Sequence, residues 1–239
     1  MKLTKAMILA AGLGTRMRPL TNTAPKPLIP VGHKPLIDWC IEWLQAGGIE
    51  EIIVNTSYLA GQLEEYLSMR RAPAIRISRE EPVPLETGGG IYKALPMIGD
   101  APFLVMNSDN IYINAGLHPI QQLVDAWDES QDFVMLMQPK ATAVGWTGNG
   151  DFVLDAKGRI RRPEKGEDAP YIFTGIEIIH PRVFIDCPDG AFSLNVLWNR
   201  RVGADGWYDH MKAVIFDGAW LNVGDVAGLE AAEKFLKTM

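Results

Sequence analysis

Cysteine is scarce in this sequence, and long apolar runs are missing. The two cysteines, Cys40 and Cys187, are too few for the disulfide framework of a small secreted protein. No apolar run approaches the roughly 18 residues that a membrane-spanning helix needs. The N-terminus is a short polar segment before a strand pattern, which is not typical of a signal peptide. We therefore expect a cytoplasmic protein without a membrane partner.

An excess of basic residues is also missing. The formal net charge of -6 at pH 7 argues against a general nucleic-acid-binding protein, but it leaves room for a local cationic pocket. The histidines lack the spacing of metal ligands, so we expect structural or exposed roles for them: His33, His118, His180 and His210. Hydrophobic residues, in contrast, make up 47% of the 239 residues, which is enough for the core of one large α/β domain.

Strand-like and helix-like segments alternate through the first half of the chain. Short apolar runs predict strands at Lys5–Leu9, Glu51–Asn55, Ala74–Arg79, Pro102–Met106 and Phe133–Gln138. Apolar residues at helical spacing predict helices at Lys34–Ala46, Leu59–Leu67, Gly89–Leu95 and Leu117–Trp127. This β–α–β order predicts an α/β fold with a doubly wound, mostly parallel, Rossmann-like sheet and helices on both faces.

The pattern changes after Gln138. Residues 152–160 indicate a short hairpin. A strand, a helix, a second strand and a closing helix are then predicted at Tyr171–Ile179, Ser193–Val202, Lys212–Phe216 and Ala227–Leu236. We interpret the second half as a small β-rich insertion or lid built onto the sheet, so that residues 1–239 form a single domain.

The segment after the first strand carries the strongest chemical signal. It reads GLGTRMRPLT from Gly12 and closes with Pro-Lys-Pro around Lys26. Gly12 and Gly14 let backbone N–H groups approach a phosphate, and Arg16 and Lys26 add positive charge. No Walker A motif is present, and Met17 replaces the third glycine of the dinucleotide fingerprint, which argues against a nicotinamide-dependent oxidoreductase. The whole string favours phosphate binding over an ordinary surface turn.

Three other segments could take part in the same chemistry. Asp109 follows a strand end, where it could be either a Mg²⁺ ligand or a turn residue. The glycine run 88–90 leads into a helix and could approach a nucleoside. Glu164 and Lys165 follow the hairpin and could reach sugar hydroxyls and a second phosphate, although such a pair is often only surface charge.

Taken together, the motifs have the order and approximate spacing found in the sugar-1-phosphate nucleotidyltransferases, and the chain resembles that family over nearly its whole length. The matching segments are Gly12–Arg18 with Pro25-Lys26-Pro27, Leu85–Gly90, Asn107–Asp109, Glu164-Lys165, Phe173–Gly175 and Trp220–Gly224. Within the family, the compact chain and the Glu-Thr-Gly-Gly-Gly string look most like the bacterial N-acetylmuramate 1-phosphate uridylyltransferases of cell-wall recycling. Short mannose- and heptose-1-phosphate guanylyltransferases share most of these features.

The resemblance implies a role for each matching residue. The nucleoside triphosphate would contact Gly12, Gly14, Thr15, Arg16 and Lys26, with Gly89 beside the base. Arg16, Lys26 and Asp109 would be catalytic, and Asp109 would hold the cofactor Mg²⁺. The sugar 1-phosphate would contact Asn107, Gly150, Glu164, Lys165 and Gly175. Residues 1–138 would form the nucleotide-binding half, and residues 139–239 the sugar-binding half with its closing helix.

One position departs from the family. Asn222 stands where a second metal-binding aspartate is usual. Its amide carbonyl can coordinate Mg²⁺ but brings no negative charge, so we expect weaker metal binding. Asp225 could substitute, although its spacing is wrong by three residues. The departure leaves open a catalytically weak nucleotide-sugar sensor or regulatory subunit.

The main hypothesis is therefore a transferase that uses UTP and N-acetylmuramate 1-phosphate and releases pyrophosphate. No side-chain base is expected, because a phosphate monoester is already mostly ionised near neutrality. A mannose- or heptose-1-phosphate guanylyltransferase is the first alternative. The base, the sugar and the choice between monomer and homodimer stay open, with Arg200 or Arg201 as candidate contacts for a lactyl ether on the sugar.

Overall fold

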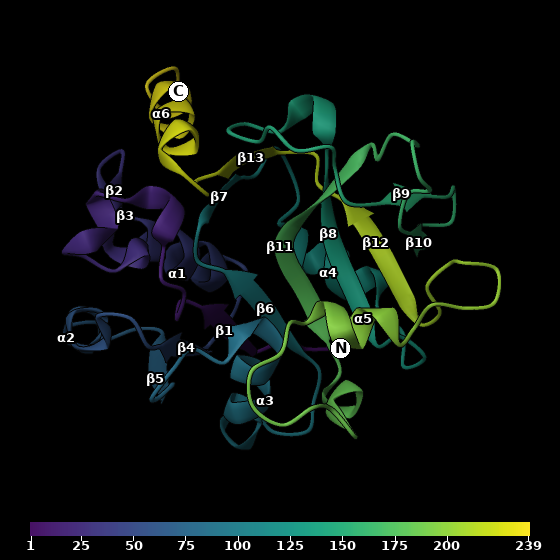
Figure 1. Cartoon of the computed structure of the whole chain (residues 1–239), viewed down its shortest axis with the longest axis horizontal. Coiled ribbons are helices and arrows are strands. Elements are labelled where there is room, and N and C mark those ends of the chain that lie inside the picture. The colour runs from purple at the N-terminus through teal and green to yellow at the C-terminus, as the bar shows by residue number, and fades with distance from the viewer.

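The computed structural model describes all 239 residues and has a central seven-stranded sheet (Figure 1). The strand order across the sheet is β12-β8-β11-β6-β1-β4-β5. The bounds are β1 Lys5–Leu9, β4 Glu51–Thr56, β5 Ala74–Arg79, β6 Phe103–Asn107, β8 Phe133–Pro139, β11 Tyr171–Ile179 and β12 Met211–Ile215. β1 lies inside the sheet because Ala6, Met7 and Ile8 are apolar and buried, as a strand covered on both faces requires.

The sheet is mostly parallel, which confirms the predicted fold class. β1 pairs in parallel with β4 and β6, β4 pairs with β5, and β8 pairs with β12. The exception is β11, which runs antiparallel between β6 and β8. Its register against β8 shifts between Phe173 and Glu177, and Gly175 there has a positive φ of 88°. Such a bulge bends the strand and re-aims its side chains.

Helices cover both faces of the sheet and bury two main apolar clusters. Their bounds are α1 Leu36–Ala46, α2 Ala60–Ser68, α3 Glu86–Ile98, α4 Pro119–Ala126, α5 Asn195–Asn199 and α6 Val226–Leu236. One cluster holds Ile41, Leu63 and Leu123 from α1, α2 and α4, and the other holds Ile91 and Leu197 from α3 and α5. Each such side chain contributes about 1.5–3 kcal/mol when it is fully buried.

Three two-stranded sheets accompany the central one. They pair β2 Pro30–Val31 with β3 Lys34–Pro35, β7 Asn110–Ile113 with β13 Ala219–Asn222, and β9 Val153–Leu154 with β10 Ile160–Arg161. The last pair is the predicted hairpin. The second half also supplies β11 and β12 to the central sheet. The β7–β13 pair, which was not predicted, ties the segment after β6 to the end of the chain (Figure 1).

The helix after the glycine run differs from the prediction. α3 contains all three glycines and continues past Pro96, which was expected to end it. A Cβ on Gly89 would lie 2.3 Å from the carbonyl oxygen of Gly190, so the glycine run permits close packing inside a helix and is not a loop. Pro96 lies in the last turn, where its missing N–H affects one hydrogen bond. α5 is also shorter than the predicted 193–202 helix.

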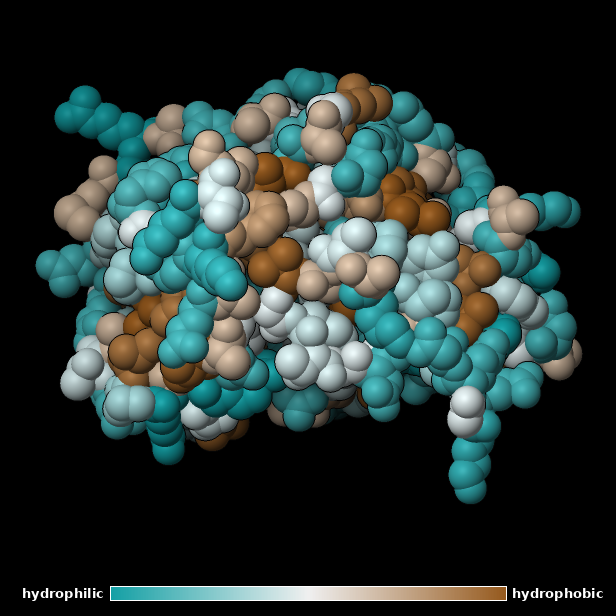
Figure 2. Space-filling model, turned by 90° about the horizontal axis from the view of Figure 1, so that it is seen from above, coloured by the Kyte–Doolittle hydropathy of each residue, from teal (hydrophilic) through white to brown (hydrophobic).

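The surface carries both hydrophilic and apolar residues. The face shown in Figure 2 is mainly hydrophilic, with apolar residues in separate patches. No helix of the protein combines the length and the hydropathy that spanning a bilayer requires.

Candidate active site

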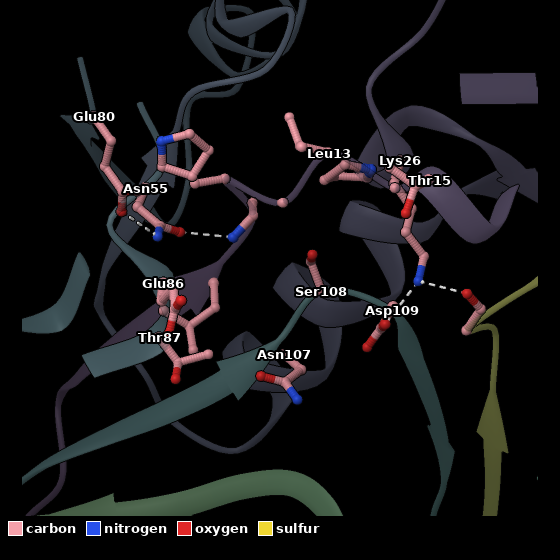
Figure 3. A pocket seen from close by; sticks show the side chains of 18 of the residues that line it. Leu13, Thr15, Lys26, Asn55, Glu80, Glu86, Thr87, Asn107, Ser108 and Asp109 are labelled. Carbon is pink, nitrogen blue, oxygen red and sulfur yellow. Dashed lines mark hydrogen bonds and ion pairs between the residues drawn. The ribbon is translucent and has the colours of Figure 1, made fainter. Parts of the chain in front are cut away.

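A cavity of about 460 Å³ opens where β1, β4 and β6 end (Figure 3). In doubly wound sheets this edge is where ligands bind. Seven of the predicted site residues line the cavity: Gly12, Gly14, Thr15, Arg16, Lys26, Asn107 and Asp109. Segments far apart in the sequence therefore converge on one space, as the phosphate-binding hypothesis requires.

Lys26 points into this cavity from a short turn between two prolines (Figure 3). Its Nζ lies 2.7 Å from Oδ2 of Asp109 and donates a hydrogen bond to the carbonyl oxygen of Gly224 at 3.4 Å. Only 11% of the lysine side chain is exposed. Gly14 makes room for it, because a Cβ there would lie 3.1 Å from Cβ of Lys26. A cation fixed in this way is suited to act as a point charge on a phosphate.

Asp109 belongs to a polar network that reaches the end of the chain. Its Oδ1 accepts a hydrogen bond from Nδ2 of Asn110 at 3.1 Å, and Oδ1 of Asn110 accepts one from Nδ2 of Asn222 at 2.9 Å. Asn110 and Asn222 are direct partners in the β7–β13 ladder, and the N–H of Val223 donates to the Asp109 carbonyl at 2.9 Å. The ladder therefore positions Asn222 close to Asp109.

Gly224 lies between Arg16 and Asn222. A Cβ on Gly224 would lie 2.8 Å from Oδ1 of Asn222 and 3.5 Å from both terminal nitrogens of Arg16. Asp225 is turned elsewhere, because its Oδ1 caps α6 by accepting a hydrogen bond from the N–H of Gly228 at 2.9 Å. Asn222, and not Asp225, therefore shares the polar network of Asp109.

The opposite end of the cavity contains a buried polar pair that the sequence analysis missed. Nδ2 of Asn55 donates to Oε1 of Glu80 at 2.7 Å, and Oδ1 of Asn55 accepts from the N–H of Ala10 at 2.6 Å. Oε2 of Glu80 accepts from the N–H of Leu85 at 2.7 Å. Figure 3 shows this pair across the cavity from the lysine–aspartate ion pair. Their positions at strand ends could have identified them as site candidates, since Asn55 lies at the end of β4 and Glu80 directly follows β5.

A second cavity of about 300 Å³ adjoins the first and shares Leu9, Thr87 and Asn107 with it. Gly175, a predicted sugar contact, also lines this second cavity. A Cβ on Gly175 would lie only 2.7 Å from Nδ2 of Asn107, so the glycine allows the asparagine side chain to occupy the boundary between the cavities. Two of the predicted sugar-phosphate residues are thus brought together.

The other predicted sugar-phosphate residues line neither cavity. Gly150 forms a turn in which a Cβ would lie 2.0 Å from the carbonyl oxygen of Ala169, and its neighbour Asp151 lines the second cavity instead. Glu164 and Lys165 are exposed in the loop between β10 and β11. Sequence order alone therefore did not place these two residues at the cavity.

Three further expectations also fall outside the cavities. Gly89 is buried inside α3, and neither cavity includes it. Arg201 forms an ion pair with Asp132, and Nη2 of Arg200 donates to the carbonyl oxygen of Asp186 at 2.8 Å. The two arginines are therefore engaged away from the second cavity, where a contact with the sugar would be needed.

Glu177 is a buried acid in the wall of the second cavity. Its side chain is 1% exposed, and Oε2 accepts a hydrogen bond from Nε1 of Trp198 at 3.1 Å. Oε1 has no hydrogen-bond partner. Burial raises the pKa of this carboxyl well above its ordinary value, although the hydrogen bond from Trp198 opposes the shift. The folded protein thus keeps this proton at pH values where an exposed glutamate has lost it.

A Glu177→Gln variant is expected to remove a pH-dependent loss of stability. As the pH rises past the pKa of the unfolded glutamate, the unfolded chain releases the proton while the folded protein retains it. The free energy of unfolding of the unsubstituted protein then falls by at most about 1.4 kcal/mol per pH unit, until the folded-state pKa is reached. Urea unfolding between about pH 4.5 and pH 8 measures the effect. As the pH rises, the free energy of unfolding of the variant should increase relative to that of the unsubstituted protein. Parallel curves for the two proteins would contradict the assignment, and the exposed Glu65→Gln should give parallel curves.

Comparison with known proteins agrees with this geometry. A family model described as nucleotidyl transferase matches residues 5–187. The chain belongs to the nucleotidyl transferase family. It is 42% identical to the N-acetylmuramate alpha-1-phosphate uridylyltransferase of Caulobacter vibrioides over 95% of each chain, and 36% identical to the protein of that name from Neisseria meningitidis over 96% of each chain. The family predicted from the motifs is confirmed.

The fold of this nucleotidyl transferase is also found in solved structures. The crystal structure of HddC from Yersinia pseudotuberculosis complexed with GMP-PN has a TM-score of 0.76, covers 98% of this chain and 100% of its own, and is 22% identical. At that identity the likeness concerns the fold. Two mannose-1-phosphate guanylyltransferases, from Oryza sativa and Aspergillus fumigatus, are matched over only 61% and 60% of their own length, against 95% and 96% for the two uridylyltransferases. Members of the family generally use a divalent metal ion.

Proposed function

We propose that this enzyme transfers a uridylyl group from UTP to N-acetylmuramate 1-phosphate and releases pyrophosphate. One observation carries the proposal: the cavity where Arg16, Lys26 and Asp109 converge adjoins a second cavity that can hold a sugar. A nucleotide in the first cavity and a sugar in the second would bring their phosphates together near Asn107, which lines both. The two uridylyltransferases that match nearly the whole chain support the choice of base and sugar.

The transfer is expected to depend on positioning and charge neutralisation. An oxygen of the sugar phosphate attacks the α-phosphorus of UTP in line, and pyrophosphate leaves. No histidine lines the cavity, and none is needed, because the second pKa of a phosphate monoester is about 6. Arg16 and Lys26 would neutralise charge on the triphosphate, and binding in the cavity would align the reacting atoms.

We propose Mg²⁺ as the metal. The carboxylate of Asp109 and the amide oxygen of Asn222 are hard oxygen donors, and magnesium usually takes one or two carboxylates together with substrate phosphates and water. Asn110 links the two side chains, because it donates to Oδ1 of Asp109 and accepts from Nδ2 of Asn222, so the pair would offer one carboxylate and one amide oxygen to the metal. When bound, the metal supplies further positive charge beside the phosphates.

Asn222→Asp is expected to tighten divalent metal binding about tenfold or more. A second carboxylate near the metal adds a full charge, and even in a partly solvated site that is worth more than the 1.4 kcal/mol of a tenfold change. Titration of Mn²⁺ into the protein with bound UTP, followed by calorimetry, measures the effect. Asn222→Ala should weaken binding. Equal affinity in all three proteins would show that the side chain of Asn222 does not face the metal.

Pyrophosphate release over a panel of nucleoside triphosphates and sugar 1-phosphates tests the proposed function. The highest kcat/KM is expected for UTP with N-acetylmuramate 1-phosphate. Preference for GTP with mannose or heptose 1-phosphate would instead support the guanylyltransferase alternative. Tight UTP binding without release for any acceptor would support a sensor, the alternative that Asn222 motivates.

Less direct parts of the hypothesis stay proposals. Glu164 and Lys165 would contact the acceptor only after their exposed loop moves toward the second cavity. The division into a nucleotide-binding half (1–138) and a sugar-binding half (139–239) is supported by the first cavity, whose lining comes mainly from the first half.

A cytoplasmic location is supported by two free cysteines. Light scattering would decide between monomer and homodimer.

A further inference from the structure

The second cavity has a single basic residue in its lining. Arg162 directly follows β10, and the acidic members Asp151 and Glu177 and the aromatic member Trp198 complete much of the wall. The expected candidates for this position, Arg200 and Arg201, are engaged elsewhere. Arg162 was not singled out by any motif, and only the arrangement of side chains places it at the cavity.

The guanidinium of Arg162 is held in place without a carboxylate partner. Its Nη2 donates to Oδ1 of Asn195 at 2.5 Å, and its Nη1 donates to the carbonyl oxygen of Asp151 at 3.3 Å. Its central carbon lies 4.1 Å from the centre of the Phe152 ring and 5.9 Å from that of Trp198. The nearby Arg161, in contrast, forms an ion pair with a glutamate. Because a guanidinium has five N–H donors, Arg162 keeps donors for a ligand.

No acid around the cavity forms an ion pair with this cation, although the charge of Arg162 opposes the rise that burial gives to the pKa of Asp151. Oδ2 of Asp151 accepts a hydrogen bond from the N–H of Phe173 at 3.0 Å, and Arg162 contacts the main chain of Asp151 and forms no ion pair with its carboxylate. Glu177 is directed to Trp198. A stacked, unpaired guanidinium at the rim of a cavity has the geometry for two parallel hydrogen bonds to a planar anion.

We propose that Arg162 binds a carboxylate carried by the acceptor sugar and thereby selects sugar 1-phosphates with an acidic substituent. This inference rests on the proposed function, because N-acetylmuramate differs from N-acetylglucosamine by a lactyl ether that ends in a carboxylate. The phosphate of the acceptor lies toward Asn107 and the first cavity, so the lactyl carboxylate is the anionic group left for the rim. Arg162 is thus a specificity-determining residue and takes no part in the phosphoryl transfer itself.

The test compares two acceptors that differ only in the lactyl group. With UTP, Arg162→Gln should lower kcat/KM for N-acetylmuramate 1-phosphate by about 10- to 100-fold, mainly through KM, as loss of a charge-assisted hydrogen bond predicts. The value for N-acetylglucosamine 1-phosphate should change less than about twofold. Arg162→Lys should retain part of the preference, because it keeps the charge and loses the fork.

Arg200→Gln is the matched control, since Arg200 is an exposed arginine bound to main-chain carbonyls outside the cavity. In the Arg200→Gln variant, the ratio of kcat/KM for the two acceptors should equal that of the unsubstituted enzyme. Two results would overturn the inference while the proposed function stands. Arg162→Gln could lose activity equally with both acceptors, or it could keep full activity with both. If the unsubstituted enzyme uses neither acceptor with UTP, the proposed function fails and this inference fails with it.

Discussion

Replacing Lys26 with alanine is expected to lower the rate of pyrophosphate release by about 10²–10³-fold, by analogy with the loss of one oxyanion-stabilising donor. Nζ of Lys26 is fixed 2.7 Å from Asp109 inside the first cavity. In the proposed mechanism, a charge held there would stabilise the negative charge that develops at the α-phosphate more than it would stabilise bound UTP. The substitution should therefore mainly lower kcat and should change KM for UTP less.

The effect should be specific to this lysine. Lys34 is a suitable control, because it is also largely shielded, at 16% exposed, and forms an ion pair with Glu42, yet it lies outside the cavity. Lys34→Ala should turn over at close to the unsubstituted rate. Near-normal turnover by Lys26→Ala, in a protein that melts normally, would remove Lys26 from the mechanism.

Gly89→Ala is expected to lower the free energy of unfolding by about 1–3 kcal/mol, the usual cost of overpacking a well-packed interior. The added methyl group would lie 2.3 Å from the carbonyl oxygen of Gly190, which is backbone and cannot rotate away. The loss should exceed the gain in helix propensity that alanine brings, about 1 kcal/mol. Urea unfolding measures the change, and a lowered melting temperature should accompany it.

Gly61→Ala provides the contrast, because Gly61 is also helical but has open space around its Cβ position. That variant should be as stable as the unsubstituted protein or slightly more stable. If Gly89→Ala were equally stable and instead bound UTP more weakly, Gly89 would be a nucleotide contact, as the family resemblance implies, and the packing role would be wrong.

Apolar strands were the most predictable part of the fold. β1, β5 and β11 have the predicted bounds, because isoleucine and other apolar residues recur in each, although Gly175 interrupts β11. The predicted helix at Gly89 began three residues after the start of α3 at Glu86, because a glycine run has low intrinsic helix propensity and only the packing against Gly190 and Phe192 explains it. The short strands β7 and β13 were missed, since their pairing joins Asn110 to Asn222 and leaves no local signal.

Part of the cavity lining could be predicted from motifs. Arg16, Lys26 and Asp109 were identified from motifs at strand ends, and they do line one cavity. Asn55 and Glu80 were missed, because a single buried polar residue has no pattern until its hydrogen-bond partner is known. Arg162, an exposed residue, escaped notice because stacking on the rings of Phe152 and Trp198 from other segments cannot be read from neighbouring residues.

A crystal structure of the enzyme with bound UDP-N-acetylmuramate would test the central claim most directly. We expect the uridine and the two phosphates in the first cavity, with Lys26 and Asp109 at the phosphates, and the sugar in the second cavity with its carboxylate against Arg162. A complex in which the phosphates lie away from Lys26, or in which the sugar occupies a different surface, would contradict the account.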